Sequence, residues 1–596
     1  MKEVVVEALV PVTTEGSLAD LPRRNAQLEP HGIAFSRRTS SGTWSHLTWS
    51  EFAADVDAVA KGLIARGVKA GDRVGLMSRT RYEWTLVDFA AWRAGAVVVP
   101  IYETSSAEQV RWILGDSGAQ LLVLENDRHR SVVEQVQQSL PALGGVLQIE
   151  AGGLDQLREQ GRSVTDAELD GRASGLHRAS VATIIYTSGT TGRPKGCELT
   201  HDNFLALAEN AIEKLGDVVL ADRASTLLFL PLAHVFARFI EVLCVAARAR
   251  MGHSSDITSL LDDFSTFRPT FILAVPRVFE KIYNSAEAKA ASEGKGKIFL
   301  RAATVATAYS ESLDHGRPGW ALRVQHAVFD RLLYSKLRTA MGGQVRYAVS
   351  GGGPLGTRLG HFFRGIGVTI LEGYGLTETT APITVNTPDK IKIGTVGPPL
   401  PGSAIRIDGD GEVLARGNGV FSRYHDNDQA TREAIVDGWF RTGDLGELDE
   451  DGYLRITGRK KEIIVTAGGK NVAPAVLEDR LRAHPLVSQC IVVGEGKPFI
   501  GVLVTLDSEM WPMWAKTHGL GDLPMSEAAG NPVVLEALQH AIDRANEAVS
   551  RAESIRKFAV LPGDFTEDNG YLTPSLKLKR PVVLKDFAED VEKLYR

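Results

Sequence analysis

The stretch that decides the fold reads Tyr186-Thr-Ser-Gly-Thr-Thr-Gly-Arg-Pro-Lys-Gly196. It follows an apolar run, residues 181–185, which predicts a buried strand. Its glycines let backbone N–H groups approach an anion closely, and its hydroxyls and Lys195 add donors and positive charge. This composition, directly after a strand, indicates a phosphate-binding loop.

A flexible surface turn is the alternative interpretation of a stretch rich in glycine and threonine. The enrichment in glycine, hydroxyl and basic residues continues throughout residues 186–196, directly after a strand, and this favours the phosphate interpretation. The loop is not a Walker A motif, because Lys195 is followed by Gly196 where that motif requires serine or threonine.

Length and composition indicate a globular protein with several folding units. A chain of 596 residues is too long for one hydrophobic core, and 44% apolar with 23% charged residues is an ordinary globular balance. The net charge of -6 gives no electrostatic reason to expect nucleic acid as a partner. Three cysteines without paired spacing favour a reducing compartment over a disulfide framework or a zinc site.

The sequence shows no targeting or membrane-spanning signal. Charge interrupts the N-terminus too early for a signal peptide, and no stretch approaches the ~18–20 uncharged apolar residues that span a bilayer. We therefore expect a cytoplasmic protein.

The first 180 residues alternate helical and strand patterns. A capping box, Thr48-x-x-Glu51, opens a predicted helix that stops at Gly67. Residues 74–77 and 96–99 predict buried strands, with a helix over 84–92 between them. Such alternation predicts an α/β fold with parallel strand pairing.

Four further apolar runs end abruptly in glycine-rich or polar residues, as the run before the phosphate loop does. In open α/β sheets ligands bind outside the carboxyl ends of the strands, so we expect one composite site at that edge. The four runs lead into Pro231-Leu-Ala-His234, Pro276-Arg277, Ser350-Gly-Gly-Gly-Pro354 and Glu372-Gly-Tyr-Gly-Leu-Thr-Glu378.

The last ~140 residues predict a compact α+β module. Short strands are expected at 453–456 and 463–465, around the basic turn 458–461. Pro474 opens a helix, strands follow at 491–493 and 500–506, and a long helix is expected over 533–549. We predict domains at 1–457 and 458–596.

The residues after these strands predict a nucleoside triphosphate site. A carboxylate beside a phosphate loop requires a divalent cation between them, so Glu378 is a candidate Mg²⁺ ligand. Tyr374, flanked by glycines, can stack on a planar base. Asp444 can accept hydrogen bonds from ribose hydroxyls, and a helix cap or turn is its alternative role.

The same segments resemble the adenylate-forming superfamily, which includes acyl-CoA synthetases, luciferases and adenylation domains. The matching motifs occur in the family's order from about residue 20 to the C-terminus. They are residues 186–196, 372–379, 442–444 and 458–461. Residues 230–234, 275–283 and 465–474 resemble the long-chain fatty-acid–CoA ligases, most of all the actinobacterial type.

The resemblance implies a large N-terminal α/β domain built from subdomains, a smaller mobile C-terminal α+β domain, and two half-reactions. A long-chain fatty-acid carboxylate attacks the α-phosphate of Mg-ATP, which gives an acyl-adenylate and pyrophosphate. The thiol of coenzyme A then attacks the acyl carbon and AMP leaves. Such a transfer needs positioning and positive charge more than covalent catalysis.

The resemblance also assigns residues. His234 would lie by the fatty-acid carboxylate, Lys461 at the hinge, and Glu378 with Thr187 on Mg²⁺. The phosphates would be contacted by Thr187, Ser188, Gly189, Thr190, Thr191, Gly192 and Lys195. The residues around the adenine and beside the metal would be Gly351, Gly352, Gly353, Pro354, Tyr374, Gly375 and Thr377. Asp444 and Arg459 would hold the ribose, and Gly468 and Gly469 would contact the pantetheine arm of coenzyme A.

The adenylation lysine is assigned to Lys577, because Lys577-x-x-Arg580 keeps the family's spacing. The family's Pro-x-Gly before this lysine is here Pro-x-Leu576, a variation of the long-chain branch. Lys579 is the rival, and a solvated basic face is the alternative role for both lysines. Some bacterial long-chain members have a gating tryptophan four residues beyond the histidine, where this chain has Arg238.

We therefore predict a long-chain fatty-acid–CoA ligase (AMP-forming) that uses ATP, Mg²⁺ and coenzyme A. The alternatives are an acyl-AMP ligase that serves a carrier protein, and a non-catalytic nucleotide- or acyl-binding relative. A homodimer and peripheral contact with the inner face of the membrane are further hypotheses. The apolar substrate motivates the second of them, although no amphipathic basic helix stands out.

Overall fold

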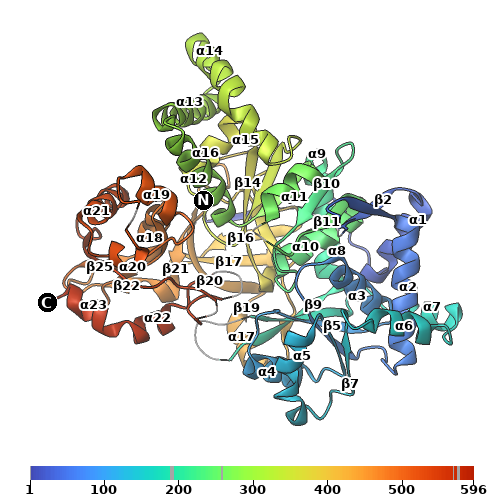
Figure 1. Ribbon diagram of the computed structural model, residues 1–596. Coiled ribbons are helices and arrows are strands. Elements are labelled where there is room, and N and C mark those ends of the chain that lie inside the picture. The colour runs from blue at the N-terminus through green and yellow to red at the C-terminus, as the bar shows by residue number, and fades with distance from the viewer. Residues whose placement is uncertain are drawn as a thin grey trace.

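The computed structural model describes residues 2–39, 41–187, 193–256, 259–521, 523–567, 569–573 and 577–596. A large N-terminal part carries several sheets, and the C-terminal segment forms a smaller body beside it (Figure 1). This arrangement confirms the predicted fold class. None of the described helices is long and apolar enough to cross a membrane.

The first large sheet has the strand order β18-β9-β8-β5-β4-β6-β7. The predicted pairing of β4 with β5 is parallel and in register from Arg73↔Val97 to Met77↔Ile101. β9 instead runs antiparallel to β8, so the chain turns back after the phosphate loop. The strands are β4 (Arg73–Met77), β5 (Val97–Ile101), β6 (Leu121–Leu124), β7 (Gly145–Gln148), β8 (Val181–Thr187), β9 (Lys195–Thr200) and β18 (Arg423–Tyr424).

The helices of this region follow their sequence signals. The hydroxyl of Thr48 accepts the Glu51 N–H at 3.2 Å, and the Glu51 carboxylate accepts the Thr48 N–H at 2.7 Å, which completes the predicted capping box. Gly67, with φ +90°, follows the end of that helix. The helices are α1 (Leu21–Leu28), α2 (Trp49–Ala65), α3 (Tyr82–Arg93), α4 (Ala107–Ser117), α5 (Asp127–Glu134), α6 (Gly153–Gly161) and α7 (Asp166–Ser174).

Two four-stranded sheets continue the N-terminal part, in the orders β10-β11-β2-β3 and β12-β13-β14-β15. The five strands expected at one sheet edge are therefore divided among three sheets, because antiparallel neighbours such as β9 and β15 close each set. The strands are β2 (Ile33–Arg38), β3 (Trp44–Thr48), β10 (Ser225–Leu228), β11 (Arg250–His253), β12 (Phe271–Ala274), β13 (Tyr347–Ser350), β14 (Thr369–Leu376) and β15 (Ala381–Val385).

Helices surround these strands, and the crossover from β12 to β13 projects from the top of the view in Figure 1. They are α8 (His201–Lys214), α9 (Gly216–Val219), α10 (Val235–Ala247), α11 (Leu260–Phe267), α12 (Pro276–Ser292), α13 (Gly296–Asp314), α14 (Trp320–Phe329), α15 (Ser335–Ala340) and α16 (Thr357–Gly365).

A six-stranded antiparallel sheet leads to the C-terminal domain. Its order is β1-β16-β17-β20-β19, with β21 on β20. Because β21 pairs through Arg459, this sheet extends past the predicted domain boundary at residue 457. The strands are β1 (Glu3–Val6), β16 (Ser403–Ile407), β17 (Glu412–Gly417), β19 (Ile435–Val436), β20 (Trp439–Leu448) and β21 (Leu454–Arg459), and α17 (Asp428–Ala434) precedes β19.

The C-terminal segment has hydrophobic cores of its own. Two clusters of buried apolar side chains draw every member from residues 464–595. The predicted strands and helices are present, with bounds shifted by a few residues. They include β22 (Ile464–Val465), β23 (Asn471–Val472), β24 (Val487–Val493), β25 (Ile500–Leu506), β26 (Ile555–Val560), α18 (Pro474–Arg482), α19 (Trp511–Thr517), α20 (Met525–Ala528), α21 (Pro532–Asn546), α22 (Arg580–Asp586) and α23 (Ala588–Leu594).

Ion pairs join the two bodies at α12. Arg277 donates to Asp507 of the C-terminal segment at 2.7 Å, and Lys281, one helical turn further, contacts Glu509. The segment 275–283, which resembles long-chain ligases in sequence, therefore holds the C-terminal body against the N-terminal one.

A buried charge cluster lies inside the N-terminal part. Nε of Arg238 donates to Asp88 at 2.9 Å, and both side chains are fully buried. The guanidinium lies 5.4 and 5.2 Å from the ring centroids of Trp84 and Trp92. Burial, and then the charge of Asp88, raise the pKa of Glu241 well above its ordinary value, which favours its uncharged form.

We expect Arg238→Met to lower the free energy of unfolding by about 3–5 kcal/mol, because it leaves the Asp88 carboxylate buried without a partner. Glu241→Gln is the matched variant on the same helix, and it should cost little because the carboxyl it replaces is already uncharged. Chemical denaturation of both variants at pH 7 measures the difference. An equal loss in the two variants would contradict this assignment of charge.

Candidate active site

The strands that flank the predicted phosphate loop form an antiparallel hairpin. Tyr186 lies opposite Gly196, and Thr187 lies opposite Lys195. The structure therefore brings the two ends of the loop together. The predicted phosphate contacts Ser188, Gly189, Thr190, Thr191 and Gly192 lie outside the described residues.

Both ends of this loop are anchored on α4. The hydroxyl of Tyr186 donates to the Asp116 carboxylate at 2.6 Å. The indole N–H of Trp112 donates to the Pro194 carbonyl at 2.9 Å, and the guanidinium of Arg193 lies 4.8 Å from the centroid of the same ring. The positions where the loop begins and ends are thus fixed by contacts with one helix.

Glu378 lies in a short helix, η5 (Thr377–Thr379), directly after β14. Its Oε1 accepts a hydrogen bond from the Tyr424 hydroxyl at 2.9 Å, and the Lys195 ammonium lies 5.0 Å from the centroid of the same tyrosine ring. Burial, and then the negative charge of Glu378, raise the pKa of the Cys197 thiol well above its ordinary value. The predicted metal ligand therefore lies beside the predicted phosphate lysine.

The metal-binding capacity of this region is small. Within the described parts of the chain, no group of three or more His, Cys, Asp or Glu side chains is arranged to hold a metal ion. A cation at Glu378 would need phosphate oxygens and water for most of its ligands. Mg²⁺ binds in this manner, with one or two carboxylates plus substrate phosphates, so the residues present fit it.

The backbone beside Glu378 is strained. Thr380 and Ala381 have φ values of +55° and +80°, which L-residues rarely adopt. The Thr380 hydroxyl holds this conformation by donating to the Gly419 carbonyl at 2.7 Å. A Cβ on Gly375 would lie 1.7 Å from the Ala381 carbonyl oxygen, so only glycine fits there. Strain of this kind gathers at functional sites.

Tyr374, Asp444 and Arg459 form one hydrogen-bonded chain. The Tyr374 hydroxyl donates to Asp444 Oδ2 at 2.7 Å, and Arg459 Nε donates to Oδ1 at 2.9 Å. Burial, and then Asp444, raise the pKa of Tyr374 well above its ordinary value. The predicted base-stacking residue and the two predicted ribose residues are thus neighbours, and both oxygens of Asp444 already accept a bond.

The glycine-rich segment Gly351–Pro354 approaches α10. A Cβ on Gly351 would lie 3.1 Å from the ring of Phe236, which shows how closely the segment approaches that helix. Nearby, the Glu372 carboxylate accepts the Leu355 N–H at 3.1 Å. Burial raises the pKa of Glu372 to about 7, and the charge of Asp479 in the C-terminal segment adds to the rise.

His234 caps the N-terminus of α10. Its Nδ1 accepts the Phe236 N–H at 3.2 Å. Burial, and then the positive charge of Lys577, lower the pKa of His234 to about 3. The imidazole is therefore neutral at pH 7, and with Nδ1 as acceptor its proton lies on Nε2, where it can be donated.

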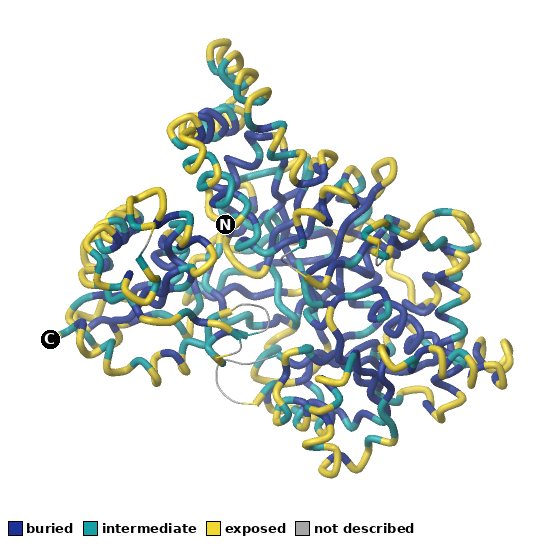
Figure 2. The backbone as a smooth tube through the Cα atoms, viewed as in Figure 1, coloured by how far each residue is buried: buried dark blue, intermediate teal, exposed yellow. Residues whose placement is uncertain are grey.

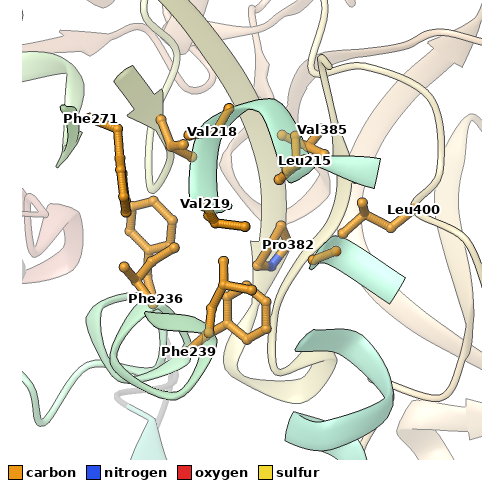
Figure 3. A pocket seen from close by; sticks show the side chains of 13 residues that line it. Leu215, Val218, Val219, Phe236, Phe239, Phe271, Pro382, Val385 and Leu400 are labelled. Atoms are coloured by element: carbon orange, nitrogen blue, oxygen red, sulfur yellow. The ribbon is translucent and has the colours of Figure 1, made fainter. Parts of the chain in front are cut away.

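A small apolar cavity lies against α10, the helix that His234 caps, between α9, α10 and the strands β12, β13 and β15 (Figure 3). Its volume is about 20 Å³, room for no more than a water-sized group, and its apolar walls offer no hydrogen bond to water. Figure 3 shows Phe236 and Phe239 on one side and Pro382 and Leu400 on another. The cavity marks an apolar region next to a neutral hydrogen-bond donor.

Lys577 approaches the site from the C-terminal segment. Its side chain is accessible to water. The pKa of Lys577 is nevertheless lowered, first by the surrounding protein and then by the positive charge of Arg459. Three carboxylates oppose this shift, which places them within electrostatic reach of the ammonium. They are Asp444, Glu378 and Glu462. The structure thus gathers predicted residues of both domains around one space.

Lys577 is distinguished from its rival by these partners. Lys579 caps the start of α22, and among the described residues no ion pair joins its side chain to a carboxylate. Arg580 is held inside its own domain, where it donates to Glu478 at 2.5 Å and to the Val492 carbonyl at 2.9 Å. A solvated basic face therefore does not describe Arg580.

Three predicted residues are not joined to the site by any contact in the described part of the chain. Lys461 is exposed directly after Lys460, which pairs with Asp410 at 2.5 Å. Gly468 and Gly469 lie in the exposed turn between β22 and β23, and Gly469 has φ +75°. Their predicted roles stay predictions.

Tyr424 and the apolar walls of α9 and α10 are site features that sequence reasoning did not identify. Tyr424 comes 46 residues after Glu378, and no local motif marks it. Phe236 lies two residues after His234. Its position in the helix that follows the histidine was the one signal that could have identified it. Arg238, at the position of a gating tryptophan in some relatives, instead points to Asp88 in the core.

Comparison with known proteins agrees with the geometry. Residues 22–425 match the profile described as AMP-binding enzyme, and residues 461–596 match that of the AMP-binding enzyme C-terminal domain. The chain is 53% identical to long-chain-fatty-acid–CoA ligase FadD15 of Mycobacterium bovis, with 100% of both chains covered. It is 30% identical to human long-chain-fatty-acid–CoA ligase ACSBG2, over 93% of this chain and 88% of that one.

Solved structures share the fold. The anthranilate CoA ligase AuaEII in complex with anthranoyl-AMP superposes with a TM-score of 0.73 at 20% identity, over 96% of this chain and 98% of that one. A fatty acyl CoA synthetase of Mycobacterium tuberculosis gives a TM-score of 0.62 at 23% identity, over 96% and 99%. With the matched profile covering most of the sequence, the chain belongs to the family of AMP-binding enzymes.

Proposed function

We propose that this enzyme is an ATP-dependent long-chain fatty acid–CoA ligase. It activates the carboxylate as an acyl-adenylate with release of pyrophosphate, and then transfers the acyl group to the thiol of coenzyme A with release of AMP. The identity to FadD15 over the whole of both chains supports the substrate class. The observation that supports the proposal is the electrostatic coupling between the domains: the charge of Lys577, from the C-terminal segment, acts on His234, and the charges of Asp444 and Glu378 act on Lys577.

The charges of the site suit adenylation. Lys195, Arg459 and Lys577 supply positive charge for the phosphates as negative charge shifts toward pyrophosphate. Asp444 would hold the ribose, Tyr374 and Gly351–Pro354 the adenine. The described ends of the phosphate loop support its role, and the role of residues 188–192 follows from the resemblance.

Glu378 and Thr187 would hold Mg²⁺, which when bound neutralises phosphate charge. The half-buried carboxylate beside Lys195 supports this assignment. Because one carboxylate alone binds Mg²⁺ weakly, we expect the metal to enter with ATP.

His234 would orient the fatty-acid carboxylate. Since its imidazole is neutral, it can donate from Nε2 without forming an ion pair that would weaken the nucleophile. The acyl chain would extend among the apolar residues behind it. The cavity there is far smaller than a long acyl chain, so binding requires the side chains of α9 and α10 to move apart.

We further propose that residues 1–457 and 458–596 act as separate domains, with the hinge near Lys461. The charge of Lys577 acts on His234, and among the described residues no contact joins Gly468 or Gly469 to the candidate site, which supports an arrangement suited to the adenylation step. Transfer to coenzyme A would then require the C-terminal domain to turn about the hinge.

A direct test of the function is ATP–pyrophosphate exchange over fatty acids of graded length, followed by product analysis with coenzyme A as the sole thiol. We expect exchange with long-chain acids and accumulation of acyl-CoA. Acyl-adenylate that forms but does not acylate coenzyme A would instead support an acyl-AMP ligase that serves a carrier protein. No pyrophosphate release with any acid would indicate a non-catalytic relative.

Lys577→Ala should reduce acyl-adenylate formation by about 10²-fold or more, because it removes a charge that stabilises the transition state. Thioester formation from supplied acyl-adenylate should be largely retained. Single-turnover measurement of each half-reaction gives the comparison, with Lys579→Ala as the neighbouring control. Equal loss of both steps, or a larger effect at Lys579, would overturn the assignment.

Glu378→Ala should weaken the use of Mg-ATP by roughly tenfold or more, since the protein's carboxylate ligand is lost. Exchange rates measured against Mg²⁺ concentration at fixed ATP report this change. Tyr424→Phe is the matched control, because it removes the hydrogen bond to Oε1 and keeps the carboxylate and the ring. If Glu378→Ala leaves the Mg²⁺ dependence unchanged, Glu378 does not bind the metal.

A further inference from the structure

Helix α14 is an apolar helix that the protein does not bury. Seven of its ten residues, Trp-Ala-Leu-Arg-Val-Gln-His-Ala-Val-Phe, are apolar, yet none of the ten is buried. It forms the outer arm of the helical hairpin α13–α14, which projects from the N-terminal part, and exposed backbone marks its end (Figures 1 and 2). A helix of this composition normally covers a core.

The exposed apolar side chains of α14 line up. Trp320, Val324 and Val328 are 80%, 55% and 52% exposed, and Leu332 in the following helical turn is 55% exposed. A spacing of four residues places such side chains along one face of a helix. A continuous exposed apolar surface marks an interaction site more often than scattered single residues do. We call these four residues the α14 stripe.

Basic residues surround the α14 stripe. Residues 315–343 contain five Lys or Arg and a single acid, in a chain whose net charge is -6. That acid, Asp330, is paired with Arg338 at 2.6 Å. Among the described residues, no ion pair holds the other basic side chains, Arg317, Arg323, Arg331 and Lys336. The surface around the stripe is therefore positive.

We propose that the α14 stripe docks on an anionic lipid bilayer, with Trp320 and the valines entering the interface and the arginines contacting lipid phosphates. An apolar helix face flanked by cations is the surface that binds such membranes. The negative charge elsewhere on the chain has little influence, because charges beyond about 10 Å are screened at physiological salt.

A second copy of the chain is a less suitable occupant. A two-fold interface brings the same patch of both subunits together, so Arg323 and Arg331 of one copy would meet those of the other. Such an interface would bury unpaired like charges, which is costly. Anionic lipid supplies the missing negative charge.

Docking at this surface has a consequence for the site. The hairpin belongs to the crossover between β12 and β13, and Phe271 and Val349 of those strands line the apolar cavity against α10. A bilayer bound at α14 would therefore be attached to the same strands that wall the candidate acyl region.

The test is co-sedimentation of the full-length protein with vesicles of phosphatidylcholine, with and without phosphatidylglycerol. We expect binding that requires phosphatidylglycerol and weakens with added salt. The double variant Arg323→Gln/Arg331→Gln should weaken it by roughly tenfold, and Trp320→Gln/Val328→Gln should weaken it at every salt concentration. Leu220→Gln/Leu261→Gln, at exposed apolar residues on other helices, should leave it unchanged.

A second measurement follows insertion directly. The three native cysteines are buried, so Val324→Cys provides one accessible thiol for an environment-sensitive dye, with Leu220→Cys as control. A blue shift on adding anionic vesicles, at position 324 alone, supports the proposal. No shift, binding that ignores lipid charge, or stripe variants that abolish self-association and leave vesicle binding intact would overturn it. These readouts do not depend on the ligase activity.

Discussion

The carboxylate of Asp444 is the contact on which the arrangement of the site depends. It accepts the Tyr374 hydroxyl at 2.7 Å and Arg459 Nε at 2.9 Å, and so joins β14, β20 and β21. Asp444 and Arg459 are direct cross-strand partners, so the register of the sheet fixes the ion pair. The chain passes from Arg459 straight into the C-terminal domain. This ion pair therefore fixes the point at which the C-terminal domain, which carries Lys577, joins the candidate nucleotide-binding residues.

Burial and neighbouring charges shift the pKa values of individual side chains in different directions in the site and in the core. Burial, and then the positive charge of Lys577, lower the pKa of His234 to about 3, whereas burial, and then the charge of Asp88, raise the pKa of Glu241 in the core. Where phosphate would bind, Lys195 lies over the ring of Tyr424, and among the described residues no ion pair joins it to a carboxylate. A site organised in this way gains its charge balance when a triphosphate enters.

Much of the fold could be predicted because its signals are local. Hydrogen bonds between residues three apart define the capping box at Thr48 and Glu51, and short apolar runs between polar residues define β4, β5, β24 and β25. The division of the strands among three sheets could not be predicted, because pairing joins residues far apart in the chain. The strand β9 was missed for another reason: it begins inside the motif read as a phosphate loop, at Lys195.

The sequence by itself determined the family and the identity of the chemical groups, since the order of the motifs and the residue types within them are properties of the chain. Tertiary structure alone decided which groups act together. It brought Lys577 under the electrostatic influence of Asp444; it turned Arg238 into the core; and it left α14 exposed, although its composition predicts burial. The physical reason is that burial and electrostatic reach depend on distances in space, which residues far apart in the chain acquire when it folds.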